Sequence, residues 1–330
     1  MTQLQTQRCR NARWRKALCV LVTVFFLLHN GCGGKVEAPA REEAIDRDQT
    51  QASSVKSSPK ERIITYAPHI TETVFALGKG EQVVAVSDFC DFPPAIETLE
   101  RVGGWHNPDL EKVTLLNPDL IIVQGQHQKV TELAQKRDIE LLQVNMDSFE
   151  TIREGIRAIG ARLNCSQTAE DLVKHFDSDL AALREAVADK PRKKVLILTG
   201  RQLHDMANFH TVGGTSFVSE LVAAAGGDNI YEETEQPYIE ASKETVVMRA
   251  PEAVIEFHAG ESVSEEVKAQ YIGDWQQLPS LPAVQKNRIY LITESHALRP
   301  GPRLLEIGAK IACLLYPGLK IEQGNHGQTP

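Results

Sequence analysis

The feature that most constrains the fold is a long amphipathic segment between residues 166 and 190. Apolar side chains recur there at helical spacing with charges between them, which predicts a helix. Ser166 is expected to cap its N-terminus, and Pro191 is a stop signal. The helix would be about 36 Å long. We interpret it as a rigid helix linking two lobes, the alternative being a long crossover helix within one large α/β domain. Its apolar residues are Leu172, Val173, Phe176, Leu180, Leu183 and Val187.

Strand and helix patterns alternate on both sides of this segment. This alternation predicts an α/β protein with a mainly parallel central sheet in each lobe, residues 61–165 and 191–320. Parallel sheets bind ligands beyond the carboxyl ends of their strands. The expected strands are 62–66, 83–86, 120–123, 141–144, 195–199, 210–212, 253–257 and 289–292, and helices are expected after Pro68 and over 216–225 and 301–315.

The first 32 residues have the pattern of an export signal. Basic residues precede an apolar run, residues 17–28, that is too short for a comfortable transmembrane helix. Gly31-Cys32 is similar to the end of a bacterial lipobox, although His29 and Asn30 depart from the usual pattern. We therefore expect an exported protein, either periplasmic or anchored to the membrane by acylated Cys32. An ordinary cysteine near a conventional cleavage site is the alternative.

Residues 33–60 are polar and lack apolar periodicity, so we expect a disordered tether there and a flexible tail over 321–330. The net charge of −8, with no basic stripe, argues against nucleic acid as a partner. Of six cysteines, Cys90 and Cys165 could pair in an oxidising compartment, and Cys313 is expected in the core. The sequence has no zinc-ligand spacing.

One pattern occurs in both lobes. Glu111 precedes Pro118 by seven residues, and Glu244 precedes Pro251 by the same distance. Each glutamate lies two residues after an expected N-cap, and each proline precedes an apolar strand. The alternative for each glutamate alone is favourable interaction with the helix dipole, about 0.3–1 kcal/mol. The matched placement favours two pseudo-symmetric lobes.

Several stretches together resemble one class of protein. They are RIITYAPHITE (62–72), VSDFCDFPP (86–94), VGGW (102–105), NPDLI (117–121) and RPGPR (299–303). These resemble the helical-backbone class of periplasmic substrate-binding proteins, which serve ABC importers of vitamin B12, ferric siderophores and haem. The resemblance covers residues 62–319 and looks closest to the cobalamin-binding branch.

This resemblance implies two α/β lobes bridged by one rigid helix, with the ligand in a cleft between them. It implies that Glu111 and Glu244 dock onto a permease dimer with its ATPase. The protein would be a monomer without enzymatic activity or a cofactor of its own, and its cargo a cobalt corrinoid or an iron chelate. The implied ligand-binding residues are Phe89, Trp105, Gln124, His210, Tyr238, Ser295 and Arg299.

Other interpretations stay open at this point. The ligand could instead be a ferric siderophore, haem or a metal ion, with His69 and His210 as the first candidate metal ligands. A metal-dependent enzyme is disfavoured because no catalytic signature is found, and a structural surface lipoprotein because aromatic residues line the expected cleft. Trp105 follows two glycines and is expected at the ligand, the alternative being the core, whereas Trp275 is expected to be structural. Gly213-Gly214-Thr215 is expected to form a tight turn, the alternative being a phosphate site.

Overall fold

The computed structural model describes residues 61–321, which belong to one compact unit. The expected signal peptide, Cys32, the tether and residues 322–330 lie outside the described residues. No helix within residues 61–321 is both long and apolar enough to cross a membrane.

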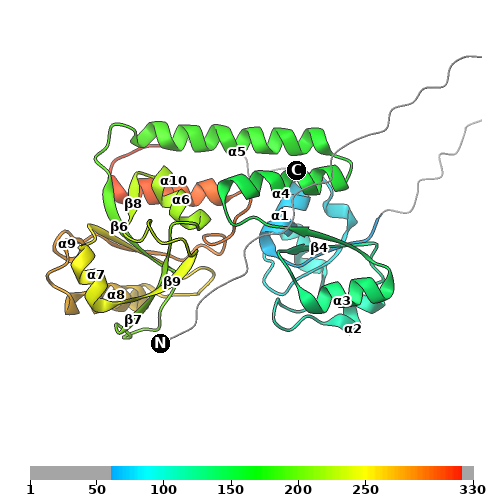
Figure 1. Cartoon of the computed structure of the whole chain (residues 1–330), viewed down its shortest axis with the longest axis horizontal. Coiled ribbons are helices and arrows are strands. Elements are labelled where there is room, and N and C mark those ends of the chain that lie inside the picture. Colours follow the sequence, from blue (N-terminus) through cyan, green and yellow to red (C-terminus); the bar gives the residue numbers. More distant parts are fainter. Residues whose placement is uncertain (1–60, 322–330) are drawn as a thin grey trace, which may run out of the picture. The chain divides into compact units, whose positions relative to one another are not determined.

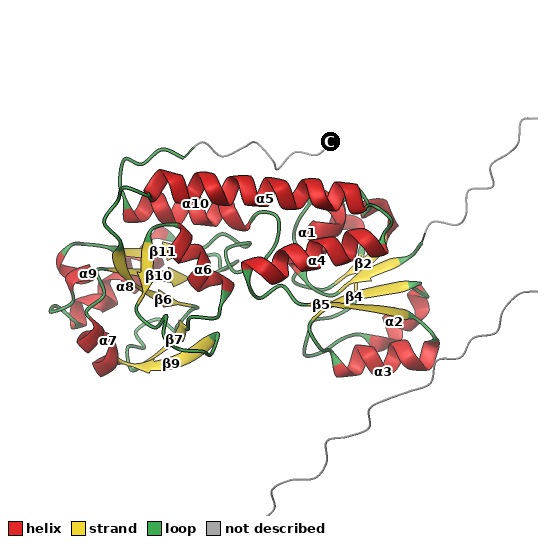
Figure 2. Cartoon of the chain, turned by 45° about the horizontal axis from the view of Figure 1, so that its top comes forward, coloured by secondary structure: helices red, strands yellow, loops and turns green. Residues whose placement is uncertain are grey.

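The first lobe contains a five-stranded sheet in the order β3-β2-β1-β4-β5, and all four strand pairs are parallel (Figures 1 and 2). The inner strand β4 is buried along four of its five residues, as expected for a parallel strand covered on both faces. The strands are β1 (Ile63–Thr65), β2 (Val83–Val86), β3 (Glu100–Arg101), β4 (Leu120–Gln124) and β5 (Glu140–Val144). The helices are α1 (Pro68–Ala76), α2 (Leu110–Leu116), α3 (Gln128–Arg137) and α4 (Phe149–Arg162).

The second lobe contains a separate sheet in the order β11-β10-β6-β7-β9, with β8 paired to β6. Strands β6, β8, β10 and β11 are parallel, whereas β7 and β9 are antiparallel to their neighbours. No helix lies between β6 and β7, and without a crossover a strand returns antiparallel. The strands are β6 (Lys193–Leu198), β7 (Asn208–Val212), β8 (Gly227–Asn229), β9 (Tyr238–Ser242), β10 (Ala253–Phe257) and β11 (Ile289–Ile292). The helices are α6 (Phe217–Ala224), α7 (Lys243–Arg249), α8 (Glu265–Asp274), α9 (Pro282–Gln285) and α10 (Leu304–Leu315).

The predicted linking helix is α5, Ser166–Val187, which runs over α4 at one end and α10 at the other (Figures 1 and 2). Its 22 residues give a length of about 33 Å. The predicted cap at Ser166 is wrong, because Cys165 occupies the N-cap position and forms no side-chain cap bond there. The residues of α5 that are buried are Ala169, Val173, Phe176, Leu180, Leu183 and Val187.

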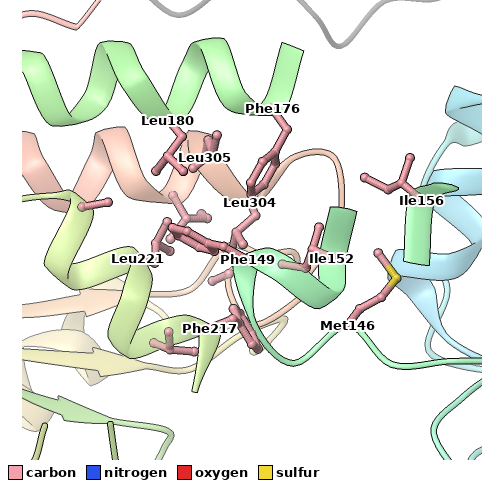
Figure 3. Packing of buried hydrophobic residues seen from close by; sticks show 14 of the residues in the cluster. Met146, Phe149, Ile152, Ile156, Phe176, Leu180, Phe217, Leu221, Leu304 and Leu305 are labelled. Carbon is pink, nitrogen blue, oxygen red and sulfur yellow. The ribbon is translucent and has the colours of Figure 1, made fainter. Parts of the chain in front are cut away.

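A single apolar cluster continues from α4 through α5 to α6 and α10 (Figure 3). At its centre the rings of Phe149 and Phe176 meet edge to face, with 5.6 Å between their centroids. A side chain at Gly308 on α10 would come within 2.8 Å of Leu183 and Leu221, so the glycine allows α10 to approach α5 and α6. The two sheets are therefore separate but share one hydrophobic layer.

The cysteines depart in part from expectation, whereas the diglycine agrees with the expectation that it does not bind a phosphate. Cys90 and Cys165 are both free thiols. Cys313 was expected in the core, but it is exposed because it falls outside the buried stripe of α10. The backbone N–H groups of Gly213 and Gly214 donate to carbonyl oxygens of residues 237 and 234, so they attach this loop to the segment before β9 and are not available to a phosphate.

Candidate functional site

The expected ligand-binding residues of the first lobe lie at or after the carboxyl ends of β2, β3 and β4. Phe89 follows β2 and leaves 68% of its surface exposed. Its ring lies close to Gly104, where an added side chain would come within 2.9 Å of the ring. An exposed phenylalanine held against a glycine loop offers an apolar face to a large flat ligand.

Trp105 is half-buried and held by another ring. Its indole packs on the buried His127 imidazole with 4.5 Å between centroids, and His127 meets the Tyr66 ring at 5.7 Å. Burial lowers the pKa of His127, so this imidazole is neutral near pH 7. The stack fixes the orientation of Trp105, which suits a recognition residue that must lose little side-chain freedom on binding.

We expect Trp105→Ala to weaken ligand binding about tenfold, because removing a fixed ring loses its buried area and about 0.5–1.5 kcal/mol of ring contact. Trp105→Phe, which keeps a ring, should recover most of the affinity. Calorimetric titration of both variants measures the effect, and circular dichroism checks that they fold. An unchanged dissociation constant for Trp105→Ala would remove this residue from the ligand site.

Gln124, the last residue of β4, links the sheet edge to α1. Its side-chain nitrogen donates to the Asp147 carboxylate at 3.0 Å, which leaves its carbonyl oxygen 3.1 Å from Nε2 of His69. Because the Asp147 carboxylate can only accept, the amide nitrogen of Gln124 must face it. The amide oxygen of Gln124 therefore faces His69 and accepts, so His69 donates through Nε2. Burial, with a smaller effect of the Arg299 charge, lowers the pKa of His69 to about 4 although the Gln124 bond opposes this. His69 is therefore a neutral, buried hydrogen-bond donor.

This buried histidine predicts a pH dependence of stability. Unfolded His69 takes up a proton near pH 6.5 and folded His69 near pH 4, so falling pH favours the unfolded chain between these values. The loss attributable to His69 should reach about 3 kcal/mol at pH 4 and be absent above about pH 7. Urea unfolding of His69→Gln, which keeps a neutral N–H donor, should show a shallower decline from pH 7 to pH 5. Parallel declines in the two proteins would contradict this assignment.

The expected residues of the second lobe lie on the antiparallel edge of its sheet. His210 on β7 is directly opposite Glu240 on β9, and Tyr238 is two residues from Glu240, so these three side chains share one sheet face. They line a concavity of about 400 Å³ together with Thr199, Gln236 and Ile239. Tyr238 is 51% exposed and His210 is also exposed. Strand β9 was not predicted, because its alternation of exposed and half-buried residues carries few apolar side chains.

Ser295 and Arg299 both bond to Asp91 of the first lobe. Arg299 forms a bidentate ion pair with this carboxylate, and the Ser295 hydroxyl adds a hydrogen bond. Burial alone would raise the pKa of Asp91, but the bonds from Arg299 and Ser295 outweigh it and hold the pKa below its usual value. Arg299 Nη2 also donates to the carbonyl oxygen of Phe89 at 3.2 Å. Arg299 thus positions the loop that carries Phe89.

A buried carboxylate on α1 completes this connection. Glu72, whose side chain is 3% exposed, accepts from Arg303 at 2.9 and 2.7 Å and from Arg299 at 3.4 Å. The Arg303 guanidinium lies 3.9 Å from the centre of the Phe92 ring. Residues 89–92 and 299–303, two of the stretches singled out in the sequence, are therefore bound to each other between the lobes.

The repeated glutamate pattern corresponds to two matched helices. Asp109 caps α2 by accepting from Lys112 N, and Ser242 caps α7 by accepting from Thr245 N. Both helices have seven residues and end at a residue with positive φ, before Pro118 and Pro251 respectively. Glu111 and Glu244 lie in the first turns and are exposed. The echo in the sequence is thus the same helix–turn–strand unit in each lobe.

Sequence reasoning missed a buried charge network at the carboxyl ends of β6 and β10. Glu256 is fully buried and bonds to Arg201, Trp275 and His258. Arg201 reaches Asp274 on α8 at 2.8 Å. Burial alone would lower the pKa of His258, but bonds to Glu256 and Glu261 raise it. The signal in the sequence was a single charge, Glu256, inside the otherwise apolar strand 253–257.

Trp275 is fully buried against Phe209, as expected of a structural residue. The two candidate metal ligands lie in different surroundings, His69 buried against Gln124 and His210 exposed beside Glu240. Within residues 61–321 no group of three or more His, Cys, Asp or Glu side chains is placed to hold a metal ion.

Comparison with known proteins agrees with this architecture. Residues 63–295 match the periplasmic binding protein family. The vitamin B12-binding protein of Pectobacterium atrosepticum is 28% identical over 268 residues, 79% of this chain and 90% of that protein. The crystal structure of the periplasmic vitamin B12-binding protein of Vibrio cholerae is 27% identical with a TM-score of 0.65, covering 78% of this chain and 97% of that one. A periplasmic haem-binding protein of Pseudomonas aeruginosa shares the fold at 21% identity and a TM-score of 0.69, covering 80% and 95%.

Proposed function

The chain belongs to the periplasmic binding protein family, and from this premise we propose that it carries cobalamin, or a closely similar corrinoid, to an ABC importer. Family membership makes it an exported substrate-binding protein and not an enzyme. The proposal of a large, flat ligand rests on two exposed aromatic rings, Phe89 and Tyr238, at the sheet edges of the two lobes. The relatives named vitamin B12-binding proteins, at 28% identity over most of their length, support a corrinoid.

In this proposal the ligand lies between the lobes, with Phe89 and Trp105 on one side and His210 and Tyr238 on the other. Aromatic faces supply apolar contact with the ring system, and the polar groups of Gln124 and His210 meet its amide periphery. Ser295 and Arg299 act mainly by holding the loop of Phe89, since their side chains bond to Asp91.

Haem is the second candidate, because exposed Tyr238 and His210 line one concavity and side chains of both kinds ligate haem iron. Solved structures of the same fold include haem-binding proteins of Pseudomonas aeruginosa and Vibrio cholerae.

Calorimetric titration of the mature protein with cyanocobalamin, haemin, a ferric siderophore and zinc tests the proposal. We expect one-to-one binding of cyanocobalamin with the highest affinity among the four. A visible spectrum of ligated haem iron that disappears in Tyr238→Phe or His210→Ala would favour the second candidate. Binding of none of the four would overturn both.

We further propose that Glu111 and Glu244 dock onto the permease, and that acylated Cys32 anchors the monomeric protein to the membrane through the tether. Exposed carboxylates on matched helices suit a partner with two equivalent basic sites, since rim charges steer and register a complex.

A further inference from the structure

The two matched helices share a second feature beside their glutamates. Four residues after Glu111, Leu115 is 84% exposed, and four residues after Glu244, Met248 is 75% exposed. Residues four apart lie on the same side of a helix, so each glutamate has a large apolar neighbour one turn away. Core packing does not require these side chains, because Val113 and Val246, fully buried, attach the two helices to their lobes.

This placement stands out against the rest of the described surface. Single exposed apolar residues are ordinary, but those of residues 61–321 are few and concentrated. Two lie at the candidate ligand site and three on α2 and α7. The exposed large apolar residues are Phe89, Leu115, Tyr238, Val247, Met248 and Ile272.

We propose that Leu115 and Met248 are the apolar anchors of the permease-docking surface, each inserted into an apolar depression beside the basic group that receives Glu111 or Glu244. This inference rests on the proposed docking function and adds to it a second, uncharged contact in each half. Charges at the rim of an interface mainly set encounter and register, whereas large apolar side chains that become fully buried lower the rate of dissociation.

Symmetry and charge identify the occupant. A glutamate with a large apolar residue four positions later occurs in each lobe, on a seven-residue helix that begins at a side-chain N-cap and ends at a left-handed residue. Such a repeated surface fits a partner that presents one recognition site twice, as a two-fold symmetric permease dimer does. A second copy of this chain would bring carboxylates against carboxylates, and an anionic lipid surface would repel them.

The test measures binding of the mature, ligand-loaded protein to nanodiscs that contain the cognate permease–ATPase complex. We expect Leu115→Ala/Met248→Ala to bind about 10- to 100-fold more weakly, mainly through faster dissociation, with ligand affinity and Tm unchanged. Ile272→Ala, which removes an exposed apolar side chain from α8, is the matched control and should bind normally. Glu111→Ala/Glu244→Ala is measured in parallel and should lose association rate.

The outcomes separate the two claims. If Glu111→Ala/Glu244→Ala lost permease binding while Leu115→Ala/Met248→Ala bound normally, the proposal of apolar anchors would be wrong and the docking proposal would stand. Normal binding by both variants, or no binding by the unsubstituted protein, overturns docking through these helices. If Leu115→Ala/Met248→Ala also lost binding to empty nanodiscs of the same lipids by an equal factor, the apolar pair would contact the membrane. If the same variant changed the sedimentation of the protein, the pair would serve self-association. Either result overturns the inference.

Discussion

Replacing both Glu111 and Glu244 with alanine is expected to abolish uptake while leaving ligand affinity near normal. Both carboxylates are exposed and lie on α2 and α7, apart from the residues proposed to touch the ligand. If each forms a charge pair with the permease that becomes desolvated, its loss costs about 2 kcal/mol or more, so two losses weaken docking by about 10³-fold. Uptake of radiolabelled cyanocobalamin by cells that carry only the variant, with calorimetry on the purified protein, measures both quantities.

A matched control separates docking from a general effect of charge. Glu132 on α3 and Glu266 on α8 are also exposed glutamates, one in each lobe. Glu132→Ala/Glu266→Ala changes the net charge equally and should preserve uptake. If the α2 and α7 variant lost ligand affinity as severely as uptake, the glutamates would belong to the ligand site and the docking assignment would fail.

The sequence predicted those parts of the fold that local patterns determine. The observed bounds of β2, β10 and β11 agree with the apolar runs that predicted them. Asp109 and Ser242 are the N-caps of α2 and α7, as predicted. Strand β9 was not predicted, because an edge strand with exposed polar residues lacks the run or alternation of apolar residues that indicates a strand. Helix α5 was found by its period and begins at Ser166 as predicted, but its N-cap is Cys165 and it ends at Val187, three residues before the predicted end.

The side-chain partners could not be predicted in the same way. The sequence named Arg299 as a candidate ligand-binding residue but did not show its ion pairs with Asp91 and Glu72, and Glu72 is 227 residues away in the chain. The Arg201–Asp274 pair joins residues 73 apart. Such pairings depend on how loops of different lobes or layers come together, which no local period records.

The connection between the lobes leads to the second large effect. Glu72→Ala is expected to lower the free energy of unfolding by about 3–5 kcal/mol, because removing one member of a buried ion pair leaves the largely buried Arg303 guanidinium without its carboxylate partner. Glu170→Ala, which removes the partner of Arg157 from an exposed pair, should cost less than about 1 kcal/mol. Urea unfolding measures the free energy of unfolding of both variants, and we expect its slope against urea concentration to be the same in the two. Equal small losses would mean that the Glu72 network adds no stability.

A double-variant cycle identifies the origin of that loss. In Glu72→Met/Arg303→Met neither charge remains, so the two changes together should cost less than the sum of the single variants. Residues 61–321 contain two tryptophans, Trp105 in the first lobe and Trp275 in the second. Because the Glu72 pairs connect residues of the two lobes, their loss should let Trp105 and Trp275 report different unfolding midpoints. We expect the unsubstituted protein to unfold in one step. Coincident midpoints in Glu72→Ala would show that the shared apolar layer of α4, α5, α6 and α10 suffices to couple the lobes.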